Sequence, residues 1–338
     1  MNKAGKMLTT AVLLGVAMNN VYAQVVLEPT TQKFIDGLAA AGGPPLYTLT
    51  PDGARKVLLA AQSGLVKIAP VDVQQRTIPV GPKGTTRIAI VRPKNAKGIL
   101  PAVMYFHGAG WVMGDLTTHE RLVRALADGV HATVIFVDYD RSPENHYPVA
   151  IEEDYAALKY VSEHHAEFNV DPSRLAVAGD SVGGNMAAVV AIMAKERKGP
   201  LIRAQALFYP VTDASMSDGS YGTYAKGPWL TKPAMAWFWN AYLPDATKRS
   251  DIHVSPLNAT SDQLQGLPTA LVITDENDVL RDEGEAYAKK LSQAGVRVTD
   301  TRYGGTIHDF MLLNALADTP AAVAATQQGI EFLKDNLH

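Results

Sequence analysis

The sequence predicts an α/β protein with a mostly parallel central sheet and helices on both faces. From residue 87 onward, short β-rich segments alternate with longer helical patterns, which is the order expected for such a sheet. Several of the β-rich segments are continuous apolar runs, as strands buried on both faces require. The 338-residue chain is 47% hydrophobic and 19% charged, so it has enough apolar material for a large core.

Hydrophobic runs and turn residues place the elements of this alternation along the chain. The expected strands are residues 87–91, 102–106, 133–138, 175–178, 204–209, 270–274 and 296–303. The expected helices are residues 118–130, 149–165, 184–197, 281–294 and 321–336. The sequence therefore predicts one large core domain over residues 74–338.

Two segments do not follow the alternation. Residues 24–73 precede the core and contain two short helical patterns, at 33–41 and 51–61. Residues 214–265 form an insertion that holds three of the four tryptophans. An aromatic insertion at this place could roof a pocket. The alternative is a peripheral patch in which the aromatic side chains make a small core of their own.

The N-terminus has the features of a secretory signal peptide. Lys3 and Lys6 are the only charges in residues 1–23, a mostly apolar run follows, and Val21-Tyr22-Ala23 resembles a cleavage site. The sequence therefore predicts export, to a bacterial periplasm or to the medium, with an uncleaved anchor as the alternative. No later stretch approaches membrane-spanning length without charges, so no stable membrane insertion is expected after cleavage.

Composition excludes several classes of function. The chain has no cysteine, which rules out disulfides, thiolate metal sites and cysteine nucleophiles. Lys and Arg total 31 against 34 Asp and Glu, and no long run of like charges occurs, so nucleic acid is not an expected partner.

A serine lies in a turn typical of a nucleophile. The pentad Gly179-Asp180-Ser181-Val182-Gly183 follows the predicted strand 175–178 and precedes the helix from residue 184. Glycines on either side of Ser181 allow a sharp turn that presents its hydroxyl beside a helix N-terminus. The alternative is an ordinary glycine-rich turn with a surface serine.

A second glycine-rich loop could supply hydrogen-bond donors. His107-Gly108-Ala109-Gly110-Trp111 follows the strand 102–106, and a bend there can turn backbone N–H groups toward an oxyanion. For His107 we expect a structural role in anchoring this loop rather than acid–base chemistry.

A serine nucleophile needs an imidazole base, and the imidazole needs an acid that orients it. In the chain order serine, acid, histidine, the best base is His308, which follows the last predicted strand. Spacing alone leaves the acid open among five carboxylates that follow the strand 270–274. These are Asp275, Glu276, Asp278, Asp282 and Glu283.

These motifs together resemble the hormone-sensitive lipase family of α/β-hydrolases, the bacterial family IV esterases. Residues 137–148, VDYDRSPENHYP, resemble the DYRLAPEHPFP block of that family, and residues 278–284, DVLRDEG, resemble its DPLRDEG block. The resemblance implies an α/β-hydrolase fold and selects Asp278 as the acid beside Ser181 and His308. It also implies hydrolysis of short-chain acyl esters through an acyl-enzyme intermediate, with no metal or cofactor. The same resemblance implies a helical cap built from the N-terminal segment 24–73 and the insertion 214–265.

The resemblance further implies an oxyanion hole formed by the amides of Ala109, Gly110 and Val182, with Gly108 shaping the loop. Ala109 stands where the family has a glycine, and Val182 where it has a smaller residue. If Ala109 has a positive φ, its methyl group makes that backbone conformation strained. The side chains of Ala109 and Val182 are both expected to narrow the substrate site. The candidate pocket residues are the aromatic side chains of Trp111, Tyr209 and Trp229.

Two other functions are compatible with this set of residues. An amidase or peptidase could use the same triad, because the nucleophile does not fix the leaving group. A non-catalytic protein that binds a small ligand is the second alternative, as in the related plant hormone receptors, but those have lost the triad histidine. The sequence leaves the oligomeric state open between a monomer and a homodimer.

Overall fold

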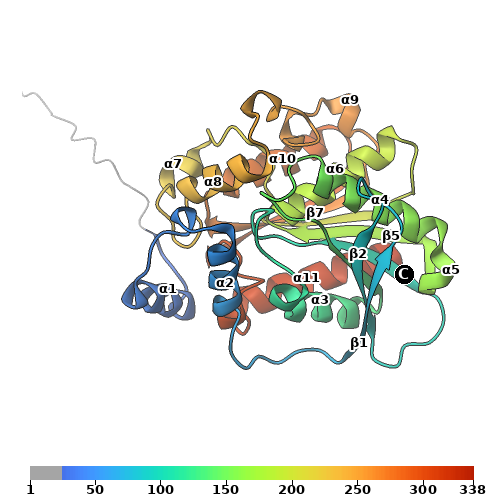
Figure 1. Ribbon diagram of the computed structural model, residues 1–338, viewed down its shortest axis with the longest axis horizontal. Helices are drawn as coiled ribbons and strands as arrows, with labels where there is room; N and C mark the ends of the chain where they lie inside the picture. Colours follow the sequence, from blue (N-terminus) through green and yellow to red (C-terminus); the bar gives the residue numbers. More distant parts are fainter. Residues whose placement is uncertain (1–24) are drawn as a thin grey trace, which may run out of the picture.

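The computed structural model describes residues 25–338, and the predicted signal peptide lies outside this part of the chain. One eight-stranded sheet, in the order β1-β2-β4-β3-β5-β6-β7-β8, forms the centre of the molecule (Figure 1). The strands are β1 (Val71–Ile78), β2 (Thr86–Pro93), β3 (Leu100–Phe106), β4 (Thr133–Asp138), β5 (Val170–Asp180), β6 (Ala204–Phe208), β7 (Thr269–Asn277) and β8 (Val298–Ile307). Strand β2 is antiparallel to both of its neighbours, and all other pairs are parallel.

All seven predicted strands are present, which confirms the predicted fold class, but β1 was not predicted. Its sequence, VDVQQRTI, is mostly polar and only Val71 and Ile78 are buried, because β1 lies at the edge of the sheet. An edge strand of this kind has neither an apolar run nor a regular alternation. The predicted division between cap segment and core, at residue 73, falls inside this strand.

Helices cover both faces of the sheet (Figure 1). On one face lie α3 (Leu116–Val130) and α11 (Pro320–Leu337), and on the other lie α4 (Val149–Glu163), α6 (Val182–Glu196) and α10 (Arg281–Gln293). Alternate side chains of β3 point to opposite faces of the sheet: Val103 and Tyr105 pack in one hydrophobic cluster, and Met104 packs in the other. The remaining short helix on the core is α5 (His165–Phe168), with one 3₁₀ turn η4 (Asn314–Leu316).

The N-terminal segment and the part of the insertion that holds α7 and α8 lie together at one end of the sheet, whereas α9 lies beside α10 (Figure 1). The N-terminal segment forms α1 (Pro29–Ala41), η1 (Leu46–Thr48) and α2 (Pro51–Ala61). The insertion forms α7 (Gly219–Thr223), α8 (Lys232–Tyr242), η2 (Ala246–Lys248), η3 (Pro256–Asn258) and α9 (Ser261–Leu264). The rings of Phe34 in α1 and Trp229 in the insertion are 5.6 Å apart, so aromatic packing joins the two segments. Within residues 25–338, no helix combines the length and apolar character needed to cross a membrane.

Candidate active site

Four loops of the site follow the carboxyl ends of β3, β5, β7 and β8. Carboxyl ends of parallel strands meet at one edge of a sheet, so residues that follow them lie close together. Strand β8 runs to Ile307, four residues beyond its predicted end, and Ile307 pairs with Asn277 at the end of β7. Asp278 directly follows β7 and His308 directly follows β8, so the sheet register places these two residues side by side.

Ser181 occupies the turn between β5 and α6 in a strained backbone conformation. Its φ and ψ are 55° and −120°, an unfavourable region for a residue with a side chain. The flanking glycines are required by close packing. A Cβ atom on Gly183 would lie 2.0 Å from the carbonyl oxygen of Phe106, and one on Gly179 would lie 2.3 Å from the carbonyl oxygen of Gly183. The pentad therefore forms the sharp turn that its glycines predict.

A continuous chain of hydrogen bonds links serine, histidine and aspartate. The Ser181 hydroxyl lies 2.9 Å from Nε2 of His308, and Nδ1 of His308 lies 2.7 Å from Oδ2 of Asp278. In the tautomer with hydrogen on Nδ1, the hydroxyl donates to Nε2 and Nδ1–H donates to Asp278. All three side chains are buried. This geometry is that of a serine nucleophile with its base and orienting acid.

The structure also distinguishes among the five carboxylates that spacing alone left open, and it agrees with Asp278, the acid that the family resemblance selected. Oδ2 of Asp275 lies 3.9 Å from Nδ1 of His308, beyond hydrogen-bonding distance, and only Asp278 is hydrogen-bonded to the imidazole. The remaining three bind elsewhere: Glu276 accepts from the amide of Gly305, Asp282 pairs with Arg281, and Glu283 accepts from the amide of Thr212.

Asp275, Asp278 and His308 are also the group of ligand-type side chains in residues 25–338 that lies close enough together for a metal ion. Within this group the Asp278 carboxylate and Nδ1 of His308 are already joined by a short hydrogen bond. We therefore assign Asp278 and His308 to proton chemistry.

The charges around His308 favour its protonated form. Burial disfavours the imidazolium, but the carboxylates of Asp278 and Asp309 outweigh it and raise the pKa of His308 to about 9. A general base must be neutral to accept the proton of the nucleophile.

The rate of ester hydrolysis is therefore expected to depend on pH in the alkaline range. Since only the neutral imidazole is active, kcat/KM should rise with pH and level off above an apparent pKa of about 9. The measurement is kcat/KM for a neutral ester between pH 6 and 10.5, with the chemical hydrolysis subtracted. A profile that is flat from pH 6 upward would contradict the charged surroundings assigned to His308.

The loop after β3 provides backbone donors near the serine. Within residues 25–338 the N–H groups of Ala109, Gly110 and Val182 have no hydrogen-bond acceptor. The N–H of Gly108 instead donates to Oδ1 of Asp180 at 3.1 Å, so this residue fixes the loop. Predicted as an anchor, His107 is fully buried, and its ring stacks on Tyr139 at 4.1 Å.

The backbone of this loop is strained where the sequence departs from the family. Ala109 has a φ of 77°, so this residue does adopt the left-handed backbone conformation that its side chain disfavours. Gly110 has a φ of 68°, and a Cβ atom there would lie 2.1 Å from the ring of Phe238. Glycine at 110 therefore lets the cap helix α8 pack directly on the loop.

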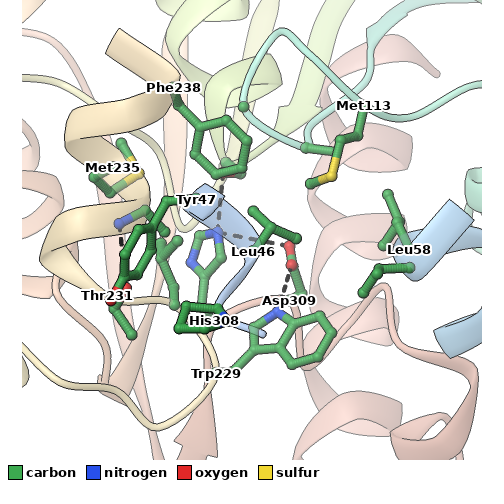
Figure 2. Close-up of a pocket in the computed structure, with 17 residues that line it drawn as sticks. Leu46, Tyr47, Leu58, Met113, Trp229, Thr231, Met235, Phe238, His308 and Asp309 are labelled. Atoms are coloured by element: carbon green, nitrogen blue, oxygen red, sulfur yellow. Dashed lines mark hydrogen bonds and ion pairs between the residues drawn. The ribbon is translucent and has the colours of Figure 1, made fainter. Parts of the chain in front are cut away.

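A cavity of about 240 Å³ opens above Ser181 and His308. Its walls are mostly apolar and come from both cap segments and from the loop after β3 (Figure 2). The N-terminal segment contributes side chains that include Leu46, Tyr47 and Leu58, and the insertion contributes Trp229, Met235 and Phe238.

Of the three predicted pocket aromatics, Trp229 lines the cavity and the other two do not. Trp111 is fully buried beneath the cap, where its ring stacks on Tyr242 at 4.2 Å. Tyr209 is buried behind the base, with its ring 5.1 Å from the imidazole of His308 in an edge-to-face arrangement. The prediction was wrong for Trp111 and Tyr209 because aromatic residues next to motifs can equally pack into the core.

The side chain of Val182 is also buried and does not line the cavity. Of the two residues expected to narrow the substrate site, only Ala109 has a side chain that lines it.

Asp309 is a cavity residue that the sequence analysis missed. Its side chain lines the cavity next to His308, and its Oδ2 accepts a hydrogen bond from the indole N–H of Trp229 at 2.8 Å (Figure 2). Burial raises the pKa of Asp309, although the neighbouring His308 and the indole N–H oppose the shift. The sequence did offer one indication of Asp309 as a site residue, because this acid directly follows the expected base His308.

Comparison with known proteins agrees with this geometry. A family model described as the alpha/beta hydrolase fold matches residues 103–312, which is more than half of the chain. The chain belongs to the α/β-hydrolase family. Its resemblance to the hormone-sensitive lipase group within that family is confirmed.

Relatives of this α/β-hydrolase cover most of its length. An esterase of known structure from Pseudomonas putida is 52% identical, with a TM-score of 0.91 over 93% of this chain and 98% of its own. R526 of Acanthamoeba polyphaga mimivirus, whose name assigns it to the alpha/beta hydrolases, is 45% identical over 87% of this chain and 84% of its own. The carboxylesterase NlhH of Mycobacterium tuberculosis is 40% identical over 79% of this chain and 83% of its own.

Proposed function

We propose that this protein is a serine carboxylesterase that hydrolyses short-chain acyl esters. The observation that carries the proposal is the buried chain of hydrogen bonds from Ser181 through His308 to Asp278, at the floor of a mostly apolar cavity. The names of the relatives, among them a carboxylesterase and an esterase, support the same activity. A non-catalytic binding protein would have no use for this arrangement.

In the proposed mechanism Ser181 attacks the ester carbonyl while His308 accepts its proton at Nε2. The amides of Ala109, Gly110 and Val182 stabilise the oxyanion of the tetrahedral intermediate. Val182 is the first residue of α6, so the positive end of the helix dipole also stabilises this negative charge. His308 then donates the proton to the leaving alcohol. Water hydrolyses the acyl-enzyme by the reverse sequence, and Asp278 stabilises the imidazolium in both halves of the reaction.

The size of the cavity supports a preference for short acyl groups. The cavity of about 240 Å³ is small, and the side chain of Ala109 lines it, so compact acyl groups fit more readily than long chains.

The direct test combines a substrate series with covalent labelling. The chain from Gln24 is assayed on p-nitrophenyl acetate, butyrate, octanoate and palmitate, and is separately treated with diethyl p-nitrophenyl phosphate, followed by peptide mass spectrometry. We expect fastest turnover of acetate or butyrate, stoichiometric inactivation, and one diethylphosphoryl group on the peptide that contains Ser181. Fastest turnover of palmitate would reject the chain-length proposal, and labelling at another serine would reject the nucleophile.

A variant of the oxyanion loop tests the proposed role of Ala109 in chain-length selection. Ala109→Gly removes the methyl group at a φ of 77° and widens the cavity. The ratio of kcat/KM for octanoate to that for acetate should rise several-fold. The free energy of unfolding should change by less than about 1 kcal/mol, because the relief of backbone strain compensates for the greater conformational entropy of glycine in the unfolded chain. An unchanged or lower ratio would contradict the prediction.

We also propose that the protein is exported and acts in a bacterial periplasm or in the medium. The support is the composition of residues 1–23, with two lysines, an apolar run and Val21-Tyr22-Ala23. Fractionation of the producing cells and sequencing of the mature N-terminus test the proposal. A mature chain beginning at Gln24 outside the cytoplasm is expected, and a cytoplasmic chain that retains residues 1–23 would overturn it.

A further inference from the structure

One buried carboxylate in the cavity has a hydrogen bond to only one of its two oxygens. Asp309 is 7% exposed, and its Oδ2 is bound by the indole N–H of Trp229. Its Oδ1 is buried and has no hydrogen-bond partner within residues 25–338. This oxygen lies 3.6 Å from Nε2 of His308, and the side chain points between the imidazole and the indole toward the cavity (Figure 2).

The imidazolium of His308 offsets the charge of Asp309 at 3.6 Å, but Oδ1 still lacks a hydrogen bond from the described residues. A buried polar group without a partner destabilises the folded protein, and more so when it is charged. The lining residues all lie in the described part of the chain, and among them Asp309 is the only carboxylic acid and none is lysine or arginine. The lining also carries the hydroxyl groups of Ser181, Tyr47 and Thr231, but none of them donates to Oδ1, and the rest of the wall is mostly apolar.

The position of Oδ1 relative to the reaction identifies the part of the substrate that it meets. In acyl transfer the imidazole donates its proton from Nε2 to the oxygen of the leaving alcohol, so this oxygen must lie beside Nε2. The carbonyl oxygen points instead toward the amides of the loop after β3. Asp309 therefore lies on the alcohol side of the ester, within reach of substituents next to the ester oxygen.

We propose that Oδ1 of Asp309 is an alcohol-side subsite that accepts a hydrogen bond from a hydroxyl or protonated amine of the substrate. The preferred substrates are then short-chain esters of diols, polyols or amino alcohols, with the donor two carbons from the ester oxygen. This inference rests on the proposed esterase activity and adds the class of alcohol. A site that hydrogen-bonds a substrate hydroxyl discriminates against the analogue without it, because its own polar group is then left unpaired.

A different role for Asp309 predicts a different result. If the carboxylate served only to stabilise the imidazolium of His308, its removal would change kcat/KM for all esters by the same factor. A subsite instead changes the ratio between esters that differ only in the donor. The ratio within one enzyme also cancels any change in folding, active fraction or base strength.

The test uses two pairs of esters with the same shape. The first pair is 2-hydroxyethyl butanoate and propyl butanoate, and the second is 2-(dimethylamino)ethyl butanoate and 3-methylbutyl butanoate. For the wild-type chain we expect kcat/KM to favour the donor-bearing member of each pair by about tenfold. In Asp309→Gly, which suits the φ of 66° at this position, the ratio should fall to within about twofold of unity.

A matched variant separates contact from the general effect of charge. Asp275→Asn alters a carboxyl group 3.9 Å from the other nitrogen of His308 but outside the cavity lining, so the wild-type ratios should persist. Asp309→Asn keeps the left-handed backbone but removes the charge, so the preference for the amine should fall more than that for the hydroxyl.

Three outcomes would overturn the subsite: ratios near unity in the wild-type chain, ratios that survive in Asp309→Gly, or ratios that Asp275→Asn also removes. Hydrolysis of p-nitrophenyl butanoate by the same wild-type sample separates this failure from failure of the esterase proposal. A sample that hydrolyses this ester but lacks the donor preference overturns the subsite alone, and an inert sample overturns both.

Discussion

Replacing His308 with alanine is expected to lower kcat for ester hydrolysis by about 10⁴- to 10⁶-fold. The hydroxyl of Ser181 donates to Nε2 of His308 at 2.9 Å and has no other acceptor among the described residues. Without the imidazole the serine stays protonated and the leaving alcohol receives no proton. The measurement is steady-state turnover of p-nitrophenyl butyrate, with the melting temperature as evidence that the variant is folded.

Residues that act as one unit give non-additive losses. The double variant Ser181→Ala/His308→Ala should therefore be no slower than Ser181→Ala alone. His253→Ala is a matched control, because His253 pairs with Glu196 away from the cavity, and it should retain wild-type turnover. Near-normal turnover in His308→Ala would show that another group is the base.

The sequence was informative wherever a local pattern determines a local structure. The apolar runs predicted the buried strands, and the glycines around Ser181 predicted the turn whose packing excludes any Cβ atom at Gly183. The chain order of serine, acid and histidine singled out His308 before any distance was known. The edge strand β1 escaped prediction because only Val71 and Ile78 of its eight residues are buried.

Contacts between distant segments were not accessible from the sequence. The bond between Trp229 and Asp309 joins residues 80 positions apart, and only the folded cap brings them together. The same limit explains the errors on Trp111 and Tyr209, since proximity to a motif does not tell which side of a loop a ring occupies. Spacing alone left the acid open for a related reason, because five carboxylates lie between residues 275 and 283, and a difference of about one ångström in distance to the imidazole separates Asp278 from Asp275.

The choice of Asp278 over Asp275 as the orienting acid predicts a large difference in turnover between their variants. Asp278→Asn is expected to lower kcat by about 10⁴-fold, whereas Asp275→Asn should lower it by less than about tenfold. An asparagine at 278 presents a neutral amide to Nδ1, which loses the charge that stabilises the imidazolium and favours the wrong tautomer. Burial, followed by the charge of Asp278, raises the pKa of Asp275 well above its usual range, which favours its neutral form. A neutral amide of the same shape at 275 should therefore change the charge of the site less than Asp278→Asn does.

The pH dependence gives the same prediction a second readout. Asp278 is the principal group that raises the pKa of His308, and burial alone would lower it. The residual activity of Asp278→Asn should consequently reach its plateau at a lower pH than the wild-type activity, while the profile of Asp275→Asn should stay close to that of the wild type. If the two variants exchange these behaviours, Asp275 is the orienting acid, and the 2.7 Å contact of Asp278 with the imidazole is then not the one that catalysis uses.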